Sequence, residues 1–463
     1  MAERRTGSGV RRGRAGWLAL LMVFAVVATS CNYDWTGFGN DAGHSNATSD
    51  TGISTANVAT LAPAFSIPNI GYLYPQPVVS HGVLYIAKSY GVLAAYDATG
   101  VEGCSGTPKT CVPLWTGDGP GPATVTPAVT HGFVVVGGRN GVIAAYDAAG
   151  ITGCSGTPKT CVPVWTATYG TWEASIQVAG DRIYVIGGPG PVLAYDAAGV
   201  IGCSGTPRTC QPIWTGPADE LTSGVVAPVS GGKLYVVDRG TAPGGPTLPQ
   251  ISVFDVDTAG CSADTPMVCT PESIVPLPLA PYVSPAVVGG VLYVPTSDGA
   301  LLAYDAATIA TCSASPADCQ PLWRAPTQGW LNISSFAGGR VFLTGSGDVR
   351  AFDAAGVVGC DGTPKVCTPL WRGSDQTAYD SYSVVANGVV YVTKDPGVAA
   401  YDAAGKLGCS GTPTVCTPLW SAPGGYRRPI VAQGTLWVPT DGSLVAYRPT
   451  PPPPPSTPST EGP

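Results

Sequence analysis

The sequence predicts an all-β chain folded as an eight-bladed β-propeller of four-stranded blades, and three observations support this prediction. A motif such as LAAYDATG recurs about every fifty residues, a spacing that indicates an array of similar supersecondary units. The chain contains 62 Gly and 46 Pro, and so many turn-forming residues between Val- and Tyr-rich runs favour short strands over helices. Seven of the repeats also carry a pair of closely spaced cysteines.

Each repeat has the pattern of four strands joined by hairpins, which is one propeller blade. Dipeptides such as His81-Gly82 and Asn140-Gly141 separate the apolar runs, and such dipeptides favour tight hairpin turns. A stacked solenoid would need caps at its ends that the sequence does not offer, whereas a ring closes its own edges. The aromatic residues that mark the repeats are Tyr96, Tyr146, Tyr195, Phe254, Tyr304, Phe352, Tyr401 and Tyr447.

Closure of the ring needs a strand from the N-terminal side. Eight copies of the first three strands are present, but only seven are followed by an outer-strand region. We therefore predict that residues 61–68, which contain Phe65, supply the outer strand of the last blade and close the ring. Large aromatics on the other outer strands are expected to pack between blades; they are Trp115, Trp165, Trp214, Trp323, Trp371 and Trp420.

The first thirty residues have the parts of an export signal. An Arg-rich start precedes an apolar run, Trp17–Ala28, and then Cys31 in a lipobox-like site, which predicts a signal peptide over residues 1–30 and a lipid on Cys31. About twelve apolar residues are too few for a transmembrane helix, which needs roughly twenty. Arg11 and Arg12 leave twin-arginine export open beside the general route. We expect an extracytoplasmic protein, lipid-anchored to the cell membrane or secreted.

The remaining chain divides into three parts. Residues 31–60 lead into the repeats, residues 61–448 form the predicted propeller, and residues 449–463 form a Pro-rich tail that cannot supply a full set of ladder donors and is expected to be disordered. The whole chain has a formal net charge of −7, and removal of residues 1–30, with five Arg and one Glu, makes it more negative. An acidic protein lacks the basic footprint that nucleic acid requires.

The cysteines predict a framework of local disulfides. One of the fifteen cysteines is Cys31, and the other fourteen form seven pairs with six or seven intervening residues. In an exported protein such pairs indicate disulfides. The alternative is metal binding, but zinc sites use tighter spacings and bring four ligands together, and the chain has three His; we predict no metal site. The predicted pairs are Cys104 with Cys111, Cys154 with Cys161, Cys203 with Cys210, Cys261 with Cys269, Cys312 with Cys319, Cys360 with Cys367, and Cys409 with Cys416.

The repeats resemble those of a known family. The A-x-D-x-x-G motif followed by Trp is similar to the PQQ repeat of quinoprotein alcohol dehydrogenase-like propellers, and DWTGFGND at residues 34–41 resembles the first segment of those enzymes, including the branch that oxidises polyvinyl alcohol. The resemblance implies the propeller fold and, for the enzymes, alcohol oxidation with PQQ and calcium. The adjacent cysteines that the enzymes place against the quinone are missing here. Non-catalytic members, including envelope assembly lipoproteins and sensor domains, fit equally well.

Strand order predicts a candidate site at one mouth of the central channel. Links between blades share one face with the turns between second and third strands, and we expect the disulfide loops on the opposite face. Aromatic and charged residues concentrate in the links, as a small-molecule or glycan site requires. The alternatives are a seal in which Glu173 or Asp380 pairs with Arg427, and a protein contact. The candidates are Tyr74, Trp172, Glu173, Tyr282, Trp330, Asn332, Tyr379, Asp380, Tyr382, Tyr426, Arg427 and Arg428.

Two functional hypotheses follow. The first is a non-catalytic scaffold that binds an envelope protein, a small molecule or a glycan, and that contacts the membrane through Cys31. The second is a PQQ-dependent alcohol dehydrogenase with calcium among Glu173, Asn332 and Asp380. Outside these residues the sequence offers no nucleophile with a base, and the Asp of each repeat motif is expected to cap a turn. An insert at residues 240–250 is a candidate lid or partner loop.

Overall fold

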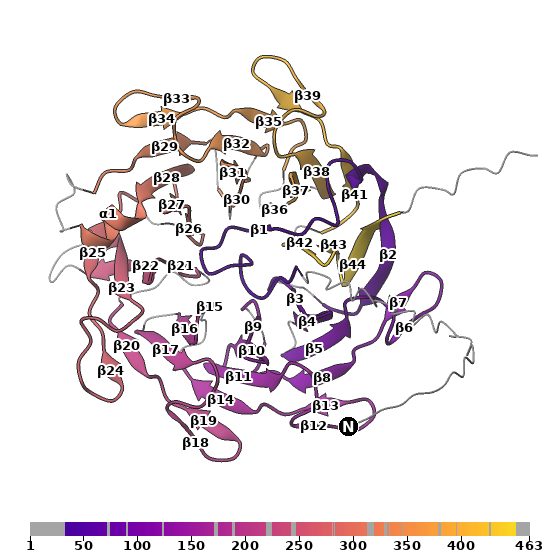
Figure 1. Cartoon of the computed structure of the whole chain (residues 1–463), viewed down its shortest axis with the longest axis vertical. Coiled ribbons are helices and arrows are strands. Elements are labelled where there is room, and N and C mark those ends of the chain that lie inside the picture. The colour runs from indigo at the N-terminus through magenta and orange to yellow at the C-terminus, as the bar shows by residue number, and fades with distance from the viewer. Residues whose placement is uncertain are drawn as a thin grey trace, which may run out of the picture. The chain divides into compact units, whose positions relative to one another are not determined.

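The computed structural model shows eight β-sheets arranged as blades around a central axis, as Figure 1 illustrates. The only helices in the described chain are η1 (Val58–Thr60) and α1 (Ala306–Thr311). None of the described helices is long and apolar enough to cross a membrane. The structure describes residues 33–450 except 72–74, 89–90, 123–124, 171–174, 188–189, 219–224, 242–246, 280, 282, 313–318, 328–330, 333, 346, 378–380, 395 and 426, and the side chains of 238–241 and 247–248.

Each blade has four antiparallel strands, which confirms the predicted unit. Blade 1 consists of β3 (Val78–Ser80), β4 (Val83–Ala87), β5 (Val92–Asp97) and β8 (Trp115–Asp118), and blade 2 of β9 (Ala128–Thr130), β10 (Phe133–Gly138), β11 (Val142–Asp147) and β14 (Trp165–Thr168). Blade 3 consists of β15 (Ser175–Ala179), β16 (Arg182–Ile186), β17 (Val192–Asp196) and β20 (Trp214–Gly216), and blade 4 of β21 (Val229–Ser230), β22 (Lys233–Thr241), β23 (Thr247–Asp255) and β25 (Ser273–Pro276). Blade 5 consists of β26 (Ala286–Val288), β27 (Val291–Pro295), β28 (Ala300–Asp305) and β29 (Trp323–Pro326), and blade 6 of β30 (Ser335–Ala337), β31 (Arg340–Leu343), β32 (Arg350–Asp353) and β35 (Trp371–Gly373). Blade 7 consists of β36 (Ser383–Ala386), β37 (Val389–Lys394), β38 (Gly397–Asp402) and β41 (Trp420–Ala422), and blade 8 of β42 (Ile430–Ala432), β43 (Thr435–Pro439), β44 (Ser443–Pro449) and β2 (Leu61–Pro68).

The ends of the strands define two faces. At the end of β5 the backbone N–H of Ala98 donates to the carbonyl of Gly82 in the turn between β3 and β4, at 2.9 Å. The carboxylate of Asp97 then accepts from the N–H groups of Val101 and Glu102, so the motif Asp caps the turn as predicted. We call the side with these turns the hairpin-turn face, and the side with the links between blades the link face.

The N-terminal strand closes the ring, as the sequence predicts. Strand β2 pairs antiparallel with β44, from Leu61 opposite Pro449 to Pro68 opposite Ser443. The ring of Phe65 packs edge-on against Trp437 in the same blade, with centroids 5.6 Å apart. Because β2 precedes blade 1 in the chain, its pairing with blade 8 joins the two ends of the propeller.

All seven predicted disulfides are present, but their loops do not simply decorate one face. Most of them fold into short hairpins at the rim, and each such hairpin pairs in parallel with the outer strand of the preceding blade. The disulfide loops therefore link neighbouring blades. The rim strands are β6 (Cys104–Ser105), β7 (Thr110–Cys111), β12 (Cys154–Ser155), β13 (Thr160–Cys161), β18 (Cys203–Ser204), β19 (Arg208–Cys210), β24 (Met267–Val268), β33 (Cys360–Asp361), β34 (Lys365–Cys367), β39 (Cys409–Ser410) and β40 (Val415–Cys416).

Two of the disulfide loops depart from the regular rim hairpin. In repeat 4, Cys261 and Cys269 are eight residues apart and face each other in an isolated antiparallel bridge, so only β24 of this loop counts as a strand. In repeat 5, Cys312 directly follows helix α1, and its Cα lies 6.1 Å from that of Cys319, against 3.9 to 4.0 Å in the other six pairs. Both pairings were predicted correctly.

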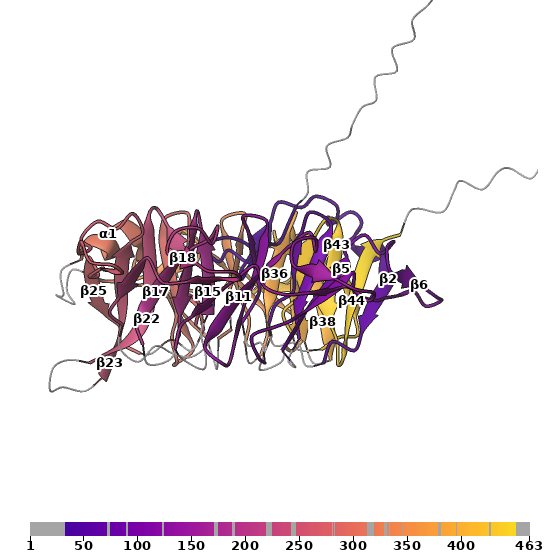
Figure 2. The same cartoon turned by 90° about the horizontal axis from the view of Figure 1, so that it is seen from below.

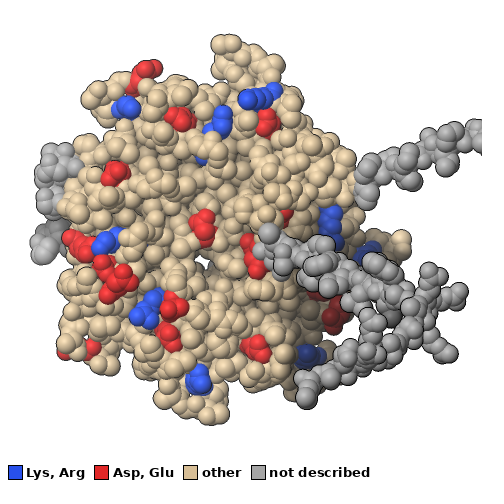
Figure 3. Space-filling view, in the orientation of Figure 1, with Lys and Arg blue, Asp and Glu red and all other residues tan. Residues whose placement is uncertain are grey.

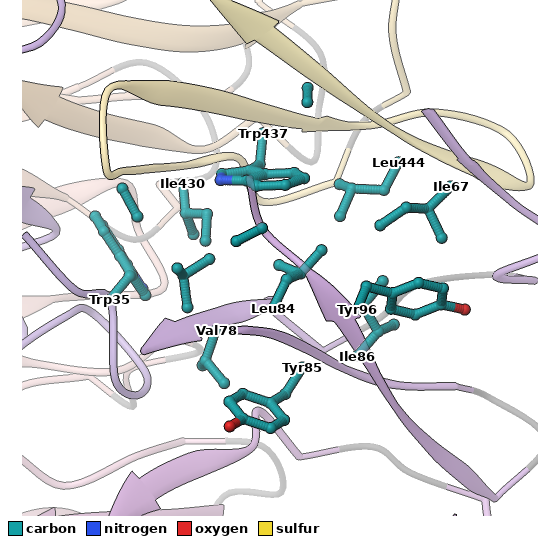
Figure 4. Packing of buried hydrophobic residues seen from close by; sticks show 14 of the residues in the cluster. Trp35, Ile67, Val78, Leu84, Tyr85, Ile86, Tyr96, Ile430, Trp437 and Leu444 are labelled. Carbon is teal, nitrogen blue, oxygen red and sulfur yellow. The ribbon is translucent and has the colours of Figure 1, made fainter. Parts of the chain in front are cut away.

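The core consists of apolar layers between neighbouring blades. Figure 4 shows one such layer, where Trp437 and Leu444 of blade 8 face Leu84 and Ile86 of blade 1. All four side chains are fully buried. Burial of large apolar side chains between sheets supplies most of the stabilisation of such a ring.

The insert in the fourth repeat is not a separate lid. Strands β22 and β23 continue their antiparallel pairing through it, from Lys233 opposite Asp255 to Thr241 opposite Thr247. Figure 2 shows this long hairpin projecting beyond the link face. The insert therefore lies on the predicted face, but as an extension of blade 4.

Candidate ligand site at the central channel

The channel is occupied by the segment that precedes the propeller, residues 33–57, which we call the lead-in segment. Figure 1 shows it crossing the centre of the ring. It contacts the inner strand or the inner turn of every blade, so that one extended segment covers all eight inner edges. The contacts are Trp35 with Val79, Thr36 with Val129, His44 with Gln177, Ala42 with Val229, Gly43 with Val287, Ser45 with Phe336, Asn46 with Val385, and Tyr33 with Gln433, in the order of blades 1 to 8.

The contact with blade 7 is a short β-ladder. Strand β1 (Ala47–Thr48) pairs in parallel with β36, with Ala47 opposite Val385. Further along, the carboxylate of Asp50 accepts from the backbone N–H groups of Gly52 and Gly434. Asp50 thus ties the lead-in segment to blade 8.

His44 is the buried polar centre of the lead-in segment. Its Nδ1 lies 3.0 Å from the carbonyl of Pro285, and its Nε2 lies 2.6 Å from Oε1 of Gln177. Burial lowers the pKa of His44 below its ordinary value, because the charged imidazolium would lose its hydration. The ring of Phe38 meets the imidazole edge-on at 4.9 Å. His44 therefore serves packing and hydrogen bonding inside the channel.

Arg428 marks the described part of the mouth on the link face. Its guanidinium lies 5.0 Å from the ring centroid of Phe38 and 4.8 Å from that of Tyr382. Both contacts are within the range of a cation–π interaction. The structure thus brings the predicted residues Tyr382 and Arg428 together. It also adds Phe38, which the sequence analysis had not placed in the mouth although it stands in the DWTGFGND motif.

The other predicted site residues have mixed outcomes. Asn332 is 8% exposed, and its backbone N–H donates to the carbonyl of Thr344 at 2.9 Å. Arg427 is described and has an interaction partner. The predicted pairing of Arg427 with Glu173 or Asp380 is untested, because both carboxylates lie outside the described residues. Eight of the twelve candidate site residues lie outside them. These are Tyr74, Trp172, Glu173, Tyr282, Trp330, Tyr379, Asp380 and Tyr426.

The calcium set of the dehydrogenase hypothesis has only one described member. Asn332 is described, whereas Glu173 and Asp380 lie outside the described residues. Within the described chain, no group of three or more His, Cys, Asp or Glu is placed to hold a metal ion. The described side chains that meet at the mouth are the rings of Phe38 and Tyr382 and the guanidinium of Arg428. Ca²⁺ prefers carboxylate and carbonyl oxygens, and of the predicted set only the amide of Asn332 is described.

A cavity of about 500 Å³ lies between blades 1 and 2 on the hairpin-turn face, next to the lead-in segment. The hydroxyl of Ser80 donates to Asp34 at 2.9 Å and lies 2.8 Å from Nδ1 of His81. Ser80 thus stands between His81 and Asp34, whereas a nucleophilic triad needs the imidazole between the other two groups. His81 and His131 have positive φ angles of 50° and 49°; both lie in the turn between the first two strands of their blades, as the sequence predicts for His81.

Eight blades of this repeat around a channel filled by the lead-in segment define the class: the protein is a β-propeller built from PQQ-type repeats. Residues 204–450 match the PQQ-repeat family model described as outer membrane protein assembly factor BamB. The match covers more than half of the chain, and the protein belongs to this family. No curated protein matches the chain by sequence.

Solved structures of BamB and of dehydrogenases share the fold. BamB from Moraxella catarrhalis has a TM-score of 0.56 and 16% identity, over 84% of this chain and 97% of that chain. Quinohemoprotein alcohol dehydrogenase from Comamonas testosteroni has a TM-score of 0.60 and 15% identity, over 89% of this chain and 80% of that chain. A europium-containing methanol dehydrogenase has a TM-score of 0.59 and 14% identity, over 90% of this chain and 98% of that chain. At these identities the likeness shows the fold alone.

Proposed function

We propose that the protein is a non-catalytic scaffold of the cell envelope, lipid-anchored at Cys31, that binds a partner protein through the link face. The observation that carries this proposal is the filled channel. A segment held by all eight blades occupies the axis, and its Phe38 stacks under Arg428 at the mouth. This arrangement presents Phe38 and Arg428 as a surface for contact at the described part of the mouth.

Three further observations support the proposal. The seven disulfides fit an oxidising, extracytoplasmic compartment. The family model is described as an assembly factor of the outer membrane, which favours a protein partner over a small molecule or glycan. Aromatic residues and Arg are also the types enriched at the centres of protein interfaces.

The test is photo-cross-linking on intact cells with the full chain. A photoreactive residue replaces Arg427 on the link face, and a matched variant carries it in place of Lys159 on the rim. We expect one specific partner to cross-link at position 427 and not at position 159. Absence of any specific product at position 427, together with PQQ-dependent alcohol oxidation by the purified protein, would overturn the scaffold proposal.

The second candidate is a PQQ- and calcium-dependent alcohol dehydrogenase. The DWTGFGND segment favours it, because it resembles the first segment of the polyvinyl-alcohol-oxidising enzymes. Glu173, Asn332 and Asp380 would hold the calcium ion, and PQQ would supply the oxidising quinone. Dye reduction by the purified protein with PQQ, calcium and simple or polymeric alcohols tests this candidate, and Asp380→Asn should abolish any turnover.

A further inference from the structure

Exposed aliphatic side chains are concentrated in one part of the repeat. In the described chain, every large aliphatic side chain that is exposed, except Ile274 and Leu279, lies between the motif Asp and the outer strand of its repeat. Seven of them are the first or second residue after the glycine of the A-x-D-x-x-G motif: Val101 (75%), Ile151 (74%), Val200 (62%), Ile201 (56%), Val357 (67%), Val358 (59%) and Leu407 (51%). Two others, Val112 and Val162 (63% each), directly follow the second cysteine of their loops.

The fold does not require apolar residues at these positions. In each of the five repeats that carry them, the motif Asp accepts from the backbone N–H groups of both residues after the glycine, as Asp402 does from Lys406 and Leu407. The backbone is therefore fixed whatever the side chains are. Polar residues already occupy one of the two positions in three repeats, as Glu102, Thr152 and Lys406 show. Even so, each of these five repeats keeps at least one exposed aliphatic side chain.

These side chains form an arc at the edge of the hairpin-turn face. Repeats 1, 2, 3, 6 and 7 carry them, whereas repeat 5 has helix α1 at this place and repeat 4 has Thr258 at the glycine position, followed by Ala259 and Gly260. Because the repeats are related by rotation about the propeller axis, equivalent residues lie at similar heights on this face. The arc runs from repeat 6 through repeat 8, which carries none of these side chains, to repeat 3, and its middle lies between repeats 8 and 1.

The described chain begins at the middle of this arc. The carbonyl of Tyr33 accepts from the backbone N–H of Gln433 in the β42–β43 turn of blade 8, and Asp34 bonds to the N–H of His81 in blade 1. Both turns lie on the hairpin-turn face. Only two residue steps separate Tyr33 from Cys31, a reach of roughly 7 Å.

We propose that the hairpin-turn face docks on a lipid bilayer and that the aliphatic arc inserts among the lipid headgroups. The proposal rests on the lipid anchor at Cys31, which belongs to the proposed function. A short tether that emerges inside the arc holds this face against the membrane, and apolar side chains at such a surface gain by leaving water. The link face then points away from the bilayer and stays free for a partner.

The distribution of the arc favours a membrane over a protein partner. A protein interface collects its apolar area in one central patch, whereas here single side chains or pairs recur at separate loops around the rim. Figure 3, which views the side crossed by the lead-in segment, shows charged residues singly and in small groups of both signs among uncharged ones. The whole chain has a formal net charge of −7, so attraction to anionic lipid is a minor part of the docking.

The test measures the membrane depth of single positions in the full-length protein, expressed in its native lipidated form and reconstituted into vesicles of phosphatidylethanolamine and phosphatidylglycerol. Ile151→Cys and Val357→Cys, each labelled with an environment-sensitive fluorophore, report the arc. Leu279→Cys is the matched control, since Leu279 is exposed (38%) beyond the end of β25 on the link side. Mass spectrometry of the N-terminal peptide reports the lipid on Cys31 independently.

We expect spin-labelled lipids to quench roughly half of the emission at positions 151 and 357 and almost none at position 279, as interfacial insertion predicts. A lipid on Cys31 without quenching at the arc would overturn the docking and leave the anchor standing. Absence of the lipid would overturn the anchor. Protection of positions 151 and 357 in cells but not in vesicles would assign the arc to a protein partner and also overturn the docking.

Discussion

The outer and inner edges of the blades are covered in different ways. At the outer edge, a repeat carries its own hairpin and covers the preceding blade, as β40 covers β35 in blade 6. At the inner edge, one lead-in segment serves all eight blades. The outer covering is repeated and local, and loss of one hairpin should affect one pair of blades. The inner covering exists once, and its loss should affect the whole ring.

Blade 7 shows what happens where the repeated covering stops. No strand in the described part of the chain pairs with the outer edge of β41, because the eighth repeat runs from Arg448 into the Pro-rich tail instead of a Cys loop. Trp420 of β41 is only partly buried, whereas Trp371 of blade 6 is 2% exposed. The indole N–H of Trp420 instead donates to the carbonyl of Leu61 at 3.0 Å, beside the closing strand.

The largest effect is expected from the inner edge. Trp35→Ala removes a fully buried indole that packs in the layer between blades 8 and 1. We expect a loss of about 3 to 5 kcal/mol in the free energy of unfolding, measured by denaturant unfolding. Trp420→Ala is the comparison, and its cost should be clearly smaller because this side chain is partly exposed. Equal costs for the two variants would contradict the ranking of the two edges.

The second prediction concerns the contact between a hairpin and the preceding blade. Gly405 has φ +67°, and a Cβ there would lie 2.3 Å from Cδ1 of Trp371. Gly405→Ala should therefore combine backbone strain with overpacking and cost about 3 kcal/mol. Gly388→Ala is the matched control, because Gly388 has φ +79° but no atom within 4 Å of the added Cβ; its cost in denaturant unfolding should stay near about 1 kcal/mol.

Removal of a single disulfide should open one outer edge and leave the ring intact. Cys409→Ser with Cys416→Ser should lower the free energy of unfolding by about 2.5 kcal/mol on the chain-entropy model. Amide exchange should rise at Arg372 and Ser374, whose N–H groups donate to Thr414 and Cys416. Increased exchange spread over all eight blades would show that the hairpins are not local coverings.

The smallest effect is the pH dependence at the inner edge. Burial lowers the pKa of His44 below 6.5. Below this pH the imidazole therefore binds a proton more readily in the unfolded chain than in the folded chain. Stability from this group is fully present above pH 6.5 and falls as the pH drops below it, by at most about 1.4 kcal/mol per pH unit. His44→Gln should reduce the difference between the unfolding curves measured at pH 7 and pH 5. An unchanged difference would refute the assignment.

Much of the fold follows from the sequence because each blade repeats its own local signals. Turn dipeptides, motif Asp residues and local Cys pairs act over short distances, and their repetition makes them easy to recognise. Closure by β2 was also predictable, because the last repeat visibly lacks an outer strand. The pairing of a Cys loop with the preceding blade was not predictable, since nothing in the loop sequence indicates the strand with which it pairs. The path of the lead-in segment could not be predicted either, because its contacts with the blades are mainly backbone hydrogen bonds, which leave no pattern in the sequence.

The candidate site was predicted only in part. Tyr382 and Arg428 come together as expected for residues in adjacent blade links. Phe38 and His44 were missed because they reach the channel from a segment that precedes the repeats, where periodicity gives no information. The remaining aromatic and acidic candidates stay predictions.

The most direct test of the scaffold proposal is calorimetric titration of the purified mature protein with PQQ in the presence of calcium. Occupation of the axis by the lead-in segment predicts no saturable heat of binding and no turnover of alcohols. Tight, stoichiometric binding of PQQ with dye reduction would contradict the proposal and make the protein a quinoprotein dehydrogenase.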